Sequence, residues 1–87
     1  MTAAPSLTTR RVLVTGADGF LGRGVVAALA REGVSTLVAA DVREVPAERR
    51  LPGVTYLVQD VRDPALAQTL AAHAIDSVVL HPLWGML

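Results

Sequence analysis

The chain has 87 residues, its eight acids balance eight arginines, and hydrophobic residues make up 52% of it. This length allows one small domain, and the hydrophobic content is ample for a packed core. A neutral chain offers no basic footprint for nucleic acid or an anionic membrane. The absence of cysteine excludes disulfides, zinc–thiolate sites and cysteine nucleophiles.

The N-terminal segment carries no targeting signal. Met1–Thr9 lacks both a basic start and an apolar core, and no apolar run reaches the ~18 residues of a membrane-spanning helix. We therefore expect a cytoplasmic protein in which residues 1–9 form a flexible lead-in to the first strand. Abundant alanine and arginine, with no lysine or asparagine, indicate the codon bias of a GC-rich bacterial genome.

The first half of the chain predicts two strands around one helix. Arg11–Thr15 is a short β-branched run that ends at glycine, which is typical of a strand buried on both faces. Apolar residues at helical spacing then predict a helix over Phe20–Glu32, with Gly33 as its C-cap. Thr36–Ala40 is a second apolar run, and Asp41 ends it.

The second half predicts a loop, a strand, a helix and a last strand. Val42–Gly53 is a polar loop with room for one helical turn, and Val54–Val58 is the third strand. Asp63 and Pro64 open the second helix, because aspartate suits the N-cap and proline the first helical position. The apolar face of this helix comprises Leu66, Leu70 and Ala74. The fourth strand is Ser77–Leu80.

This alternation predicts an α/β fold, with a parallel sheet covered by helices. Right-handed crossovers give the strand order 3-2-1-4 of a Rossmann-like half. We assign residues 10–81 to this half-domain and residues 82–87 to a divergent apolar tail. The fourth strand is then an unpaired edge through which the chain can self-associate.

The most informative motif is the glycine-rich turn after the first strand. Gly16 permits the tight turn, Gly19 lets the backbone approach a pyrophosphate, and Gly22 lets the helix pack near the strand. The N–H groups of Phe20 and Leu21 lie at the helix start, so they are candidate pyrophosphate donors. The motif predicts a dinucleotide-binding site.

An acid follows the motif at the distance that such a site requires. Asp41 lies 19 residues after Gly22, close to the expected separation of about 20. A carboxylate there accepts hydrogen bonds from the adenosine ribose and repels a 2′-phosphate, which favours NAD over NADP. Arg43 leaves two interpretations open, a partner for that 2′-phosphate and a solvated loop charge.

The segment after the third strand supplies two further candidates. Asp60 lies where a carboxylate could accept from the adenine amino group, and the N–H of Val61 could reach a ring nitrogen. The alternative is a plain strand-end turn. We assign Asp63 to the helix cap and Asp60 to the cofactor.

Together, Thr15–Gly22, Asp41 and Asp60–Val61 resemble the N-terminal half of an extended short-chain dehydrogenase/reductase. The resemblance is to the NAD-dependent epimerase/dehydratase family, and it runs from Arg11 to about Val79. It implies that these positions bind NAD(P), in a family that acts on nucleotide sugars or related alcohols and ketones. The TGxxGxxG pattern is specific to the superfamily but not to a substrate.

The family's catalytic residues cannot be carried over. They are a tyrosine with a lysine four residues later, and this chain has no lysine. Its one tyrosine, Tyr56, lies inside the third strand and is assigned to the core. Two distant histidines, His73 and His81, make no metal site. After Val79 the family pattern also fails, which suggests a truncated or frameshifted product.

We therefore expect an NAD(P)-binding fragment of an oxidoreductase, epimerase or dehydratase that is inactive alone. The alternative is a non-catalytic nucleotide-binding or interaction module.

Overall fold

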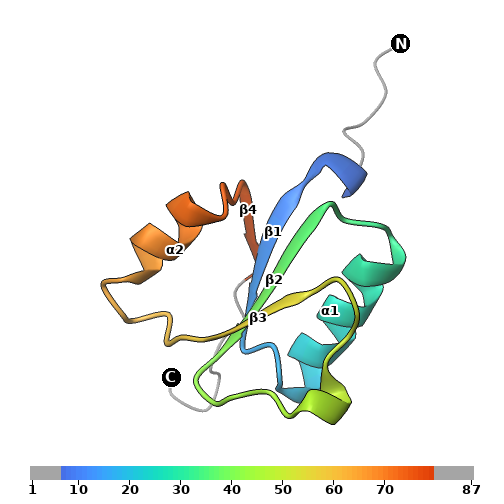
Figure 1. The fold of residues 1–87 in the computed structure, drawn as a ribbon, viewed down its shortest axis with the longest axis horizontal. Coiled ribbons are helices and arrows are strands. Elements are labelled where there is room, and N and C mark those ends of the chain that lie inside the picture. The colour runs from blue at the N-terminus through green and yellow to red at the C-terminus, as the bar shows by residue number, and fades with distance from the viewer. Residues whose placement is uncertain (1–6, 80–87) are drawn as a thin grey trace.

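The structure is a computed structural model that describes residues 7–79, in which helices and strands alternate (Figure 1). The elements in chain order are the 3-10 helix η1 (Leu7–Thr9), β1 (Arg11–Thr15), α1 (Phe20–Arg31), β2 (Thr36–Asp41), the 3-10 helix η2 (Ala47–Arg49), β3 (Thr55–Val58), α2 (Leu66–Ala72) and β4 (Ser77–Val79). Within residues 7–79, neither α-helix is long and apolar enough to span a bilayer.

Parts of the predicted terminal segments lie outside the described residues. Of the expected lead-in 1–9, the last three residues form η1, and residues 1–6 are not described. His81 and the proposed tail 82–87 also lie outside the described range.

The four strands form one parallel sheet in the order β3-β2-β1-β4, which confirms the predicted order 3-2-1-4. Leu13 in β1 lies in register with Val38 in β2 and with Val78 in β4. All four strands are therefore parallel neighbours whose carboxyl ends lie at one edge of the sheet, where α/β proteins bind ligands.

The two central strands carry the core, and their side chains alternate between the two faces of the sheet. Val12 and Val14 in β1 pack with Val26 of α1 on one face. Leu13 in β1 and Val38 in β2 are fully buried on the other face, which α2 covers. Figure 1 shows the helices on opposite sides of the strands. This double burial confirms the inference drawn from the apolar runs of β1 and β2.

The second helix is shorter than the sequence predicts. It begins at Leu66, after a turn in which Asp63 Oδ1 accepts from the N–H of Ala65 at 2.8 Å and the Asp63 carbonyl accepts from that of Leu66 at 2.9 Å. Asp63 thus caps the turn ahead of the helix. Ala74 lies beyond the helix at φ 51°, so it does not continue the apolar face.

Candidate dinucleotide-binding site

The connection from β1 to α1 is a tight glycine turn. Gly16 has φ 61°, in the left-handed region that glycine adopts without steric cost. The N–H of Gly19 donates to the Gly16 carbonyl at 3.0 Å, and that of Ala17 donates to Ala40 in β2 at 3.0 Å. The turn is therefore closed on itself and tied to the neighbouring strand.

The third glycine of the motif is explained by packing. A Cβ atom at Gly22 would lie 2.0 Å from the Gly16 carbonyl oxygen, a separation that no side chain tolerates. At Gly19 the corresponding distance to the same oxygen is 3.3 Å, which is tight but not impossible. Gly22 thus lets α1 lie directly against the turn.

The N-terminus of α1 is open. Gly19 is its N-cap, and no side chain caps the helix there. Phe20 and Leu21 are 86% and 57% exposed, so their side chains turn away from the core. Their N–H groups belong to the first helical turn, whose donors have no intrahelical acceptor and attract anions.

A cavity of about 230 Å³ lies at the carboxyl ends of β1, β2 and β3. It is lined by Thr15, Gly16, Gly19, Asp41, Val42, Gln59, Asp60, Val61 and Arg62. It brings together five of the predicted site residues, Gly16, Gly19, Asp41, Asp60 and Val61. The other four, Phe20, Leu21, Gly22 and Arg43, are not part of its lining.

Two backbone N–H groups hold the carboxylate of Asp41. Asp41 Oδ2 accepts from the N–H of Asp18 at 2.9 Å, and Oδ1 accepts from that of Arg43 at 3.1 Å. A carboxylate offers about four lone-pair sites, so roughly two remain for a ligand. The carboxylate is thereby oriented at the edge of the cavity before any ligand binds.

Asp60, in contrast, is engaged by a neighbouring arginine. Arg62 donates to both carboxylate oxygens, with its Nη2 2.6 Å from Oδ2 and its Nε 3.0 Å from Oδ1. The hydrogen bond from Arg62 lowers the pKa of Asp60 to about 2. An adenine amino group would therefore compete with Arg62 for this carboxylate. Arg62 was not among the predicted site residues, although its position two residues after Asp60 was the available signal.

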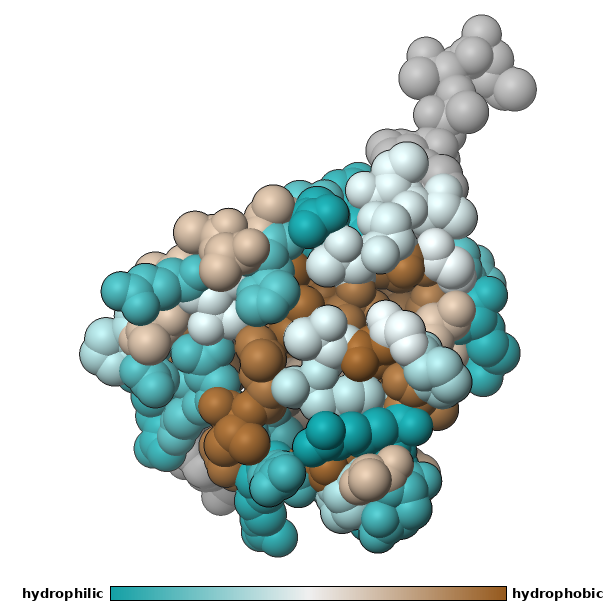
Figure 2. All heavy atoms as spheres, viewed as in Figure 1, coloured by the Kyte–Doolittle hydropathy of each residue, from teal (hydrophilic) through white to brown (hydrophobic). Residues whose placement is uncertain are grey.

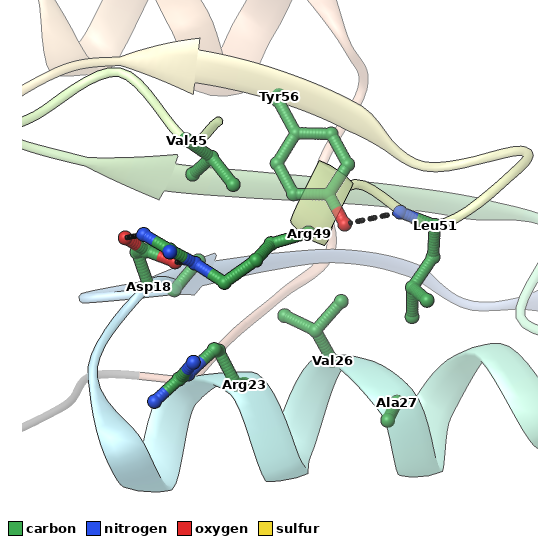
Figure 3. A pocket seen from close by; sticks show the side chains of 9 residues that line it. Asp18, Arg23, Val26, Ala27, Val45, Arg49, Leu51 and Tyr56 are labelled. Atoms are coloured by element: carbon green, nitrogen blue, oxygen red, sulfur yellow. Dashed lines mark hydrogen bonds and ion pairs between the residues drawn. The ribbon is translucent and has the colours of Figure 1, made fainter. Parts of the chain in front are cut away.

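A second cavity, also of about 230 Å³, lies between α1, β3 and the β2–β3 connection (Figure 3). The Asp18 carboxylate and the Arg49 guanidinium meet at one end of it. Tyr56 lines the other end, half-buried, where its hydroxyl accepts from the N–H of Leu51 at 2.9 Å. Tyr56 therefore anchors the connection and packs against the core, as the sequence indicated.

Among residues 7–79, no group of three or more histidine, aspartate or glutamate side chains is placed to hold a metal ion.

Fold and site define a Rossmann-type α/β half-domain with an open helix N-terminus behind a glycine turn. The model of the NAD-dependent epimerase/dehydratase family matches residues 12–81, and the chain belongs to that family. No curated protein matches the chain.

Solved structures agree with this assignment. A GalE-like L-threonine dehydrogenase from Cupriavidus necator superposes with a TM-score of 0.70 at 28% identity, and a partial-consensus L-threonine 3-dehydrogenase with 0.69 at 32%. In both cases 83% of this chain is covered but only 23% of the other. An epimerase from Methanothermobacter thermautotrophicus, at 19% identity and a TM-score of 0.70, shares the fold; 87% of this chain and 23% of that one are covered. The chain thus spans about a quarter of the length of these structures.

Proposed function

We propose that the chain binds NAD in the cavity at the carboxyl ends of β1, β2 and β3. The observation that carries the proposal is the oriented carboxylate of Asp41, held by the N–H groups of Asp18 and Arg43. Its two remaining lone-pair sites match the two hydroxyls of an adenosine ribose. Because the carboxylate repels a 2′-phosphate, NAD is favoured over NADP.

The rest of the nucleotide follows from the surroundings of Asp41. The pyrophosphate lies at the open start of α1, near the N–H groups of Phe20 and Leu21. The adenine lies beside Val42 and Val61, which are 60% and 41% exposed and supply apolar surface to the cavity. Arg43 lies two residues after the ribose acid Asp41, so it is the residue that would support any residual binding of NADP.

The chain is proposed to bind the cofactor without turning over a substrate. It has no lysine, so the Tyr-x-x-x-Lys pair of this family is absent from its sequence. The hydroxyl of Tyr56 accepts a backbone hydrogen bond from Leu51, and Tyr56 does not line the proposed nucleotide cavity. Because the cavity spans only the carboxyl ends of β1, β2 and β3, binding by these 87 residues is expected to be weak, at high micromolar to millimolar Kd, or roughly −4 to −6 kcal/mol.

Saturation-transfer NMR and calorimetry with NAD and NADP test the proposal. Asp41→Asn should weaken NAD binding about tenfold or more, because hydrogen bonds to charged groups contribute about 1.5–3 kcal/mol. The same substitution should reduce the preference of the chain for NAD over NADP. Asp63→Asn is the matched control, since Asp63 lies outside the cavity lining and asparagine also caps turns. The absence of saturation transfer at millimolar NAD would refute the proposal that the chain binds NAD. A nanomolar Kd would refute the expectation that these residues bind NAD only weakly.

A further inference from the structure

We infer that Arg49 is a positioning residue for the ribose-binding acid Asp41 and that it acts through Asp18. This inference rests on the proposed function, since it concerns how the same nucleotide site is held in shape. Neither Arg49 nor Asp18 lines the nucleotide cavity, and the role inferred for Arg49 needs no contact with the nucleotide.

The first step is the ion pair between Arg49 in η2 and Asp18 in the glycine turn. Arg49 Nε lies 2.9 Å from Asp18 Oδ1, and its Nη2 lies 2.6 Å from Oδ2. The Asp18 side chain is only 15% exposed, although that of Arg49 is 40% exposed. A two-point contact fixes the orientation of the carboxylate as well as its distance. Asp18 is therefore held in one rotamer and one place.

The second step is the backbone of the same aspartate. The N–H of Asp18 donates to Asp41 Oδ2 at 2.9 Å, so the residue that Arg49 clamps also orients the ribose acid. Asp18 is thus held at two points: the Arg49 guanidinium contacts its side chain, and the Asp41 carboxylate accepts from its backbone N–H. Loss of the guanidinium removes the contact that holds the Asp18 side chain, although the hydrogen bonds of Ala17 and Gly19 still close the turn. The orientation of the Asp41 carboxylate by the N–H of Asp18 is thereby weakened and not abolished.

The third step is the anchoring of η2, the 3-10 helix that carries Arg49. Val45 just ahead of it is 4% exposed, and its carbonyl accepts from Arg50 Nε at 2.8 Å. Behind it, the N–H of Leu51 is bonded to the hydroxyl of Tyr56, as Figure 3 shows. Both flanks of η2 are therefore held in place, so the ion pair of Arg49 with Asp18 connects the glycine turn to a fixed segment.

The experiment compares AMP with 2′-deoxy-AMP, because the difference between them reports on the ribose 2′-hydroxyl. Dissociation constants of both are measured by NMR titration for the 87-residue chain, Arg49→Gln, Arg49→Lys and Asp41→Asn. Arg31→Gln is the matched control, since Arg31 is an exposed arginine in the last turn of α1. Thermal melting checks that each variant is folded.

Arg49→Gln should weaken AMP binding about 3- to 10-fold, in the range of couplings within one hydrogen-bond network, and 2′-deoxy-AMP binding by less. The preference for AMP therefore shrinks, as it does more strongly in Asp41→Asn. Arg49→Lys should lie between, because lysine keeps the charge but not the two-point contact. In Arg49→Gln combined with Asp41→Asn, the preference should be no smaller than in Asp41→Asn alone.

Each contrary result has a distinct meaning. If the unaltered chain binds neither NAD nor AMP at millimolar concentration, the proposed function fails and the inference fails with it. If it binds AMP but Arg49→Gln keeps the full preference, as Arg31→Gln should, only the inference fails. An equal loss for both nucleotides would show that Arg49 supports the fold and not the ribose site. Should Arg49→Gln not fold, Arg49→Lys decides by the same comparison, and an unchanged preference there overturns the inference.

Discussion

Gly22 and Gly16 touch across the start of α1, so that a Cβ atom on Gly22 would lie 2.0 Å from the Gly16 carbonyl oxygen. The same added atom would also come within 2.9 Å of the Ala17 Cα. These neighbours are backbone atoms of a hydrogen-bonded turn, so they have no rotamer by which to move aside. The close contact between helix and turn brings the open N-terminus of α1 to the carboxyl edge of the sheet.

This contact predicts a large difference between two glycines of one helix. Gly22→Ala should destabilise the protein by about 3 kcal/mol or more, at the upper end of the cost of overpacking. Gly24→Ala should stabilise it by about 0.5–1 kcal/mol, because nothing lies within 4 Å of the added methyl group and alanine favours helix. Urea unfolding of both variants measures the difference, and similar free energies of unfolding would contradict the close contact.

Substitution of Gly19, the second glycine of the motif, is predicted to reduce nucleotide binding but not the stability of the fold. Gly19 has φ −74°, so the backbone would not be strained by a side chain at this position. The nearest atom to an added Cβ would be the Gly16 carbonyl oxygen, at 3.3 Å. Gly19→Val should abolish nucleotide binding, because its methyl groups obstruct the approach to the phosphates, whereas Gly19→Ala should retain part of it. Titration with NAD, beside a melting curve for each variant, tests this order. Unchanged binding in Gly19→Val would put the site elsewhere.

The pair of Asp60 and Arg62 predicts a dependence of stability on acid pH. The hydrogen bond from Arg62 lowers the pKa of Asp60 to about 2 in the folded protein, from roughly 3.9 in the unfolded chain. Because the folded-state pKa is the lower one, the stabilisation is complete above about pH 4 and is lost as the pH falls toward 2. NMR titration of the carboxyl carbon should show a midpoint near 2 for Asp60. In Arg62→Gln the midpoint should rise part of the way toward about 4, because the backbone N–H of residue 62 still donates to Asp60 Oδ1. A midpoint that does not move in Arg62→Gln would show that another group holds the pKa down.

Much of the fold could be predicted because its signals are local. The β-branched run of Arg11–Thr15 and the glycines after it determine a strand, a turn and the start of a helix within a few residues of each other. The predicted start of α2 was wrong, and the reason is also local. Asp63 and Pro64 favour a helix start, but the Asp63 carboxylate caps Ala65 in a separate turn before Leu66.

The site was less predictable because its charged partners are chosen by the fold. Asp18 and Arg49 are 31 residues apart in the sequence, and neither has a spacing that announces the pair. Only the return of the β2–β3 connection to the glycine turn brings them together. The position of Asp41 in the cavity lining was predictable, because its distance from the motif follows from the length of one helix and one strand. Its orientation by Asp18 was not, since it depends on the geometry of the turn.

The edges of the sheet carry the last prediction, which is self-association. Within residues 7–79, β4 pairs only with β1 and β3 only with β2, so each presents one unpaired side. Val78 in β4 and Val58 in β3 are 43% and 62% exposed. On the one face of the molecule that Figure 2 shows, apolar surface lies over the strands between polar margins. Open apolar edges pair with other chains.

We expect the chain to associate as its concentration rises, through β4. Val78→Lys should shift the protein toward the monomer, because an edge lysine must lose its hydration or leave the pairing surface. Val58→Lys is the matched variant on the opposite edge, and comparison of the two variants shows which edge pairs. Light scattering after size-exclusion chromatography, over a range of loading concentrations, measures the mass. A monodisperse monomer at every concentration would refute the association, and a larger effect of Val58→Lys would move it to β3. Neither Val78 nor Val58 lines the nucleotide cavity.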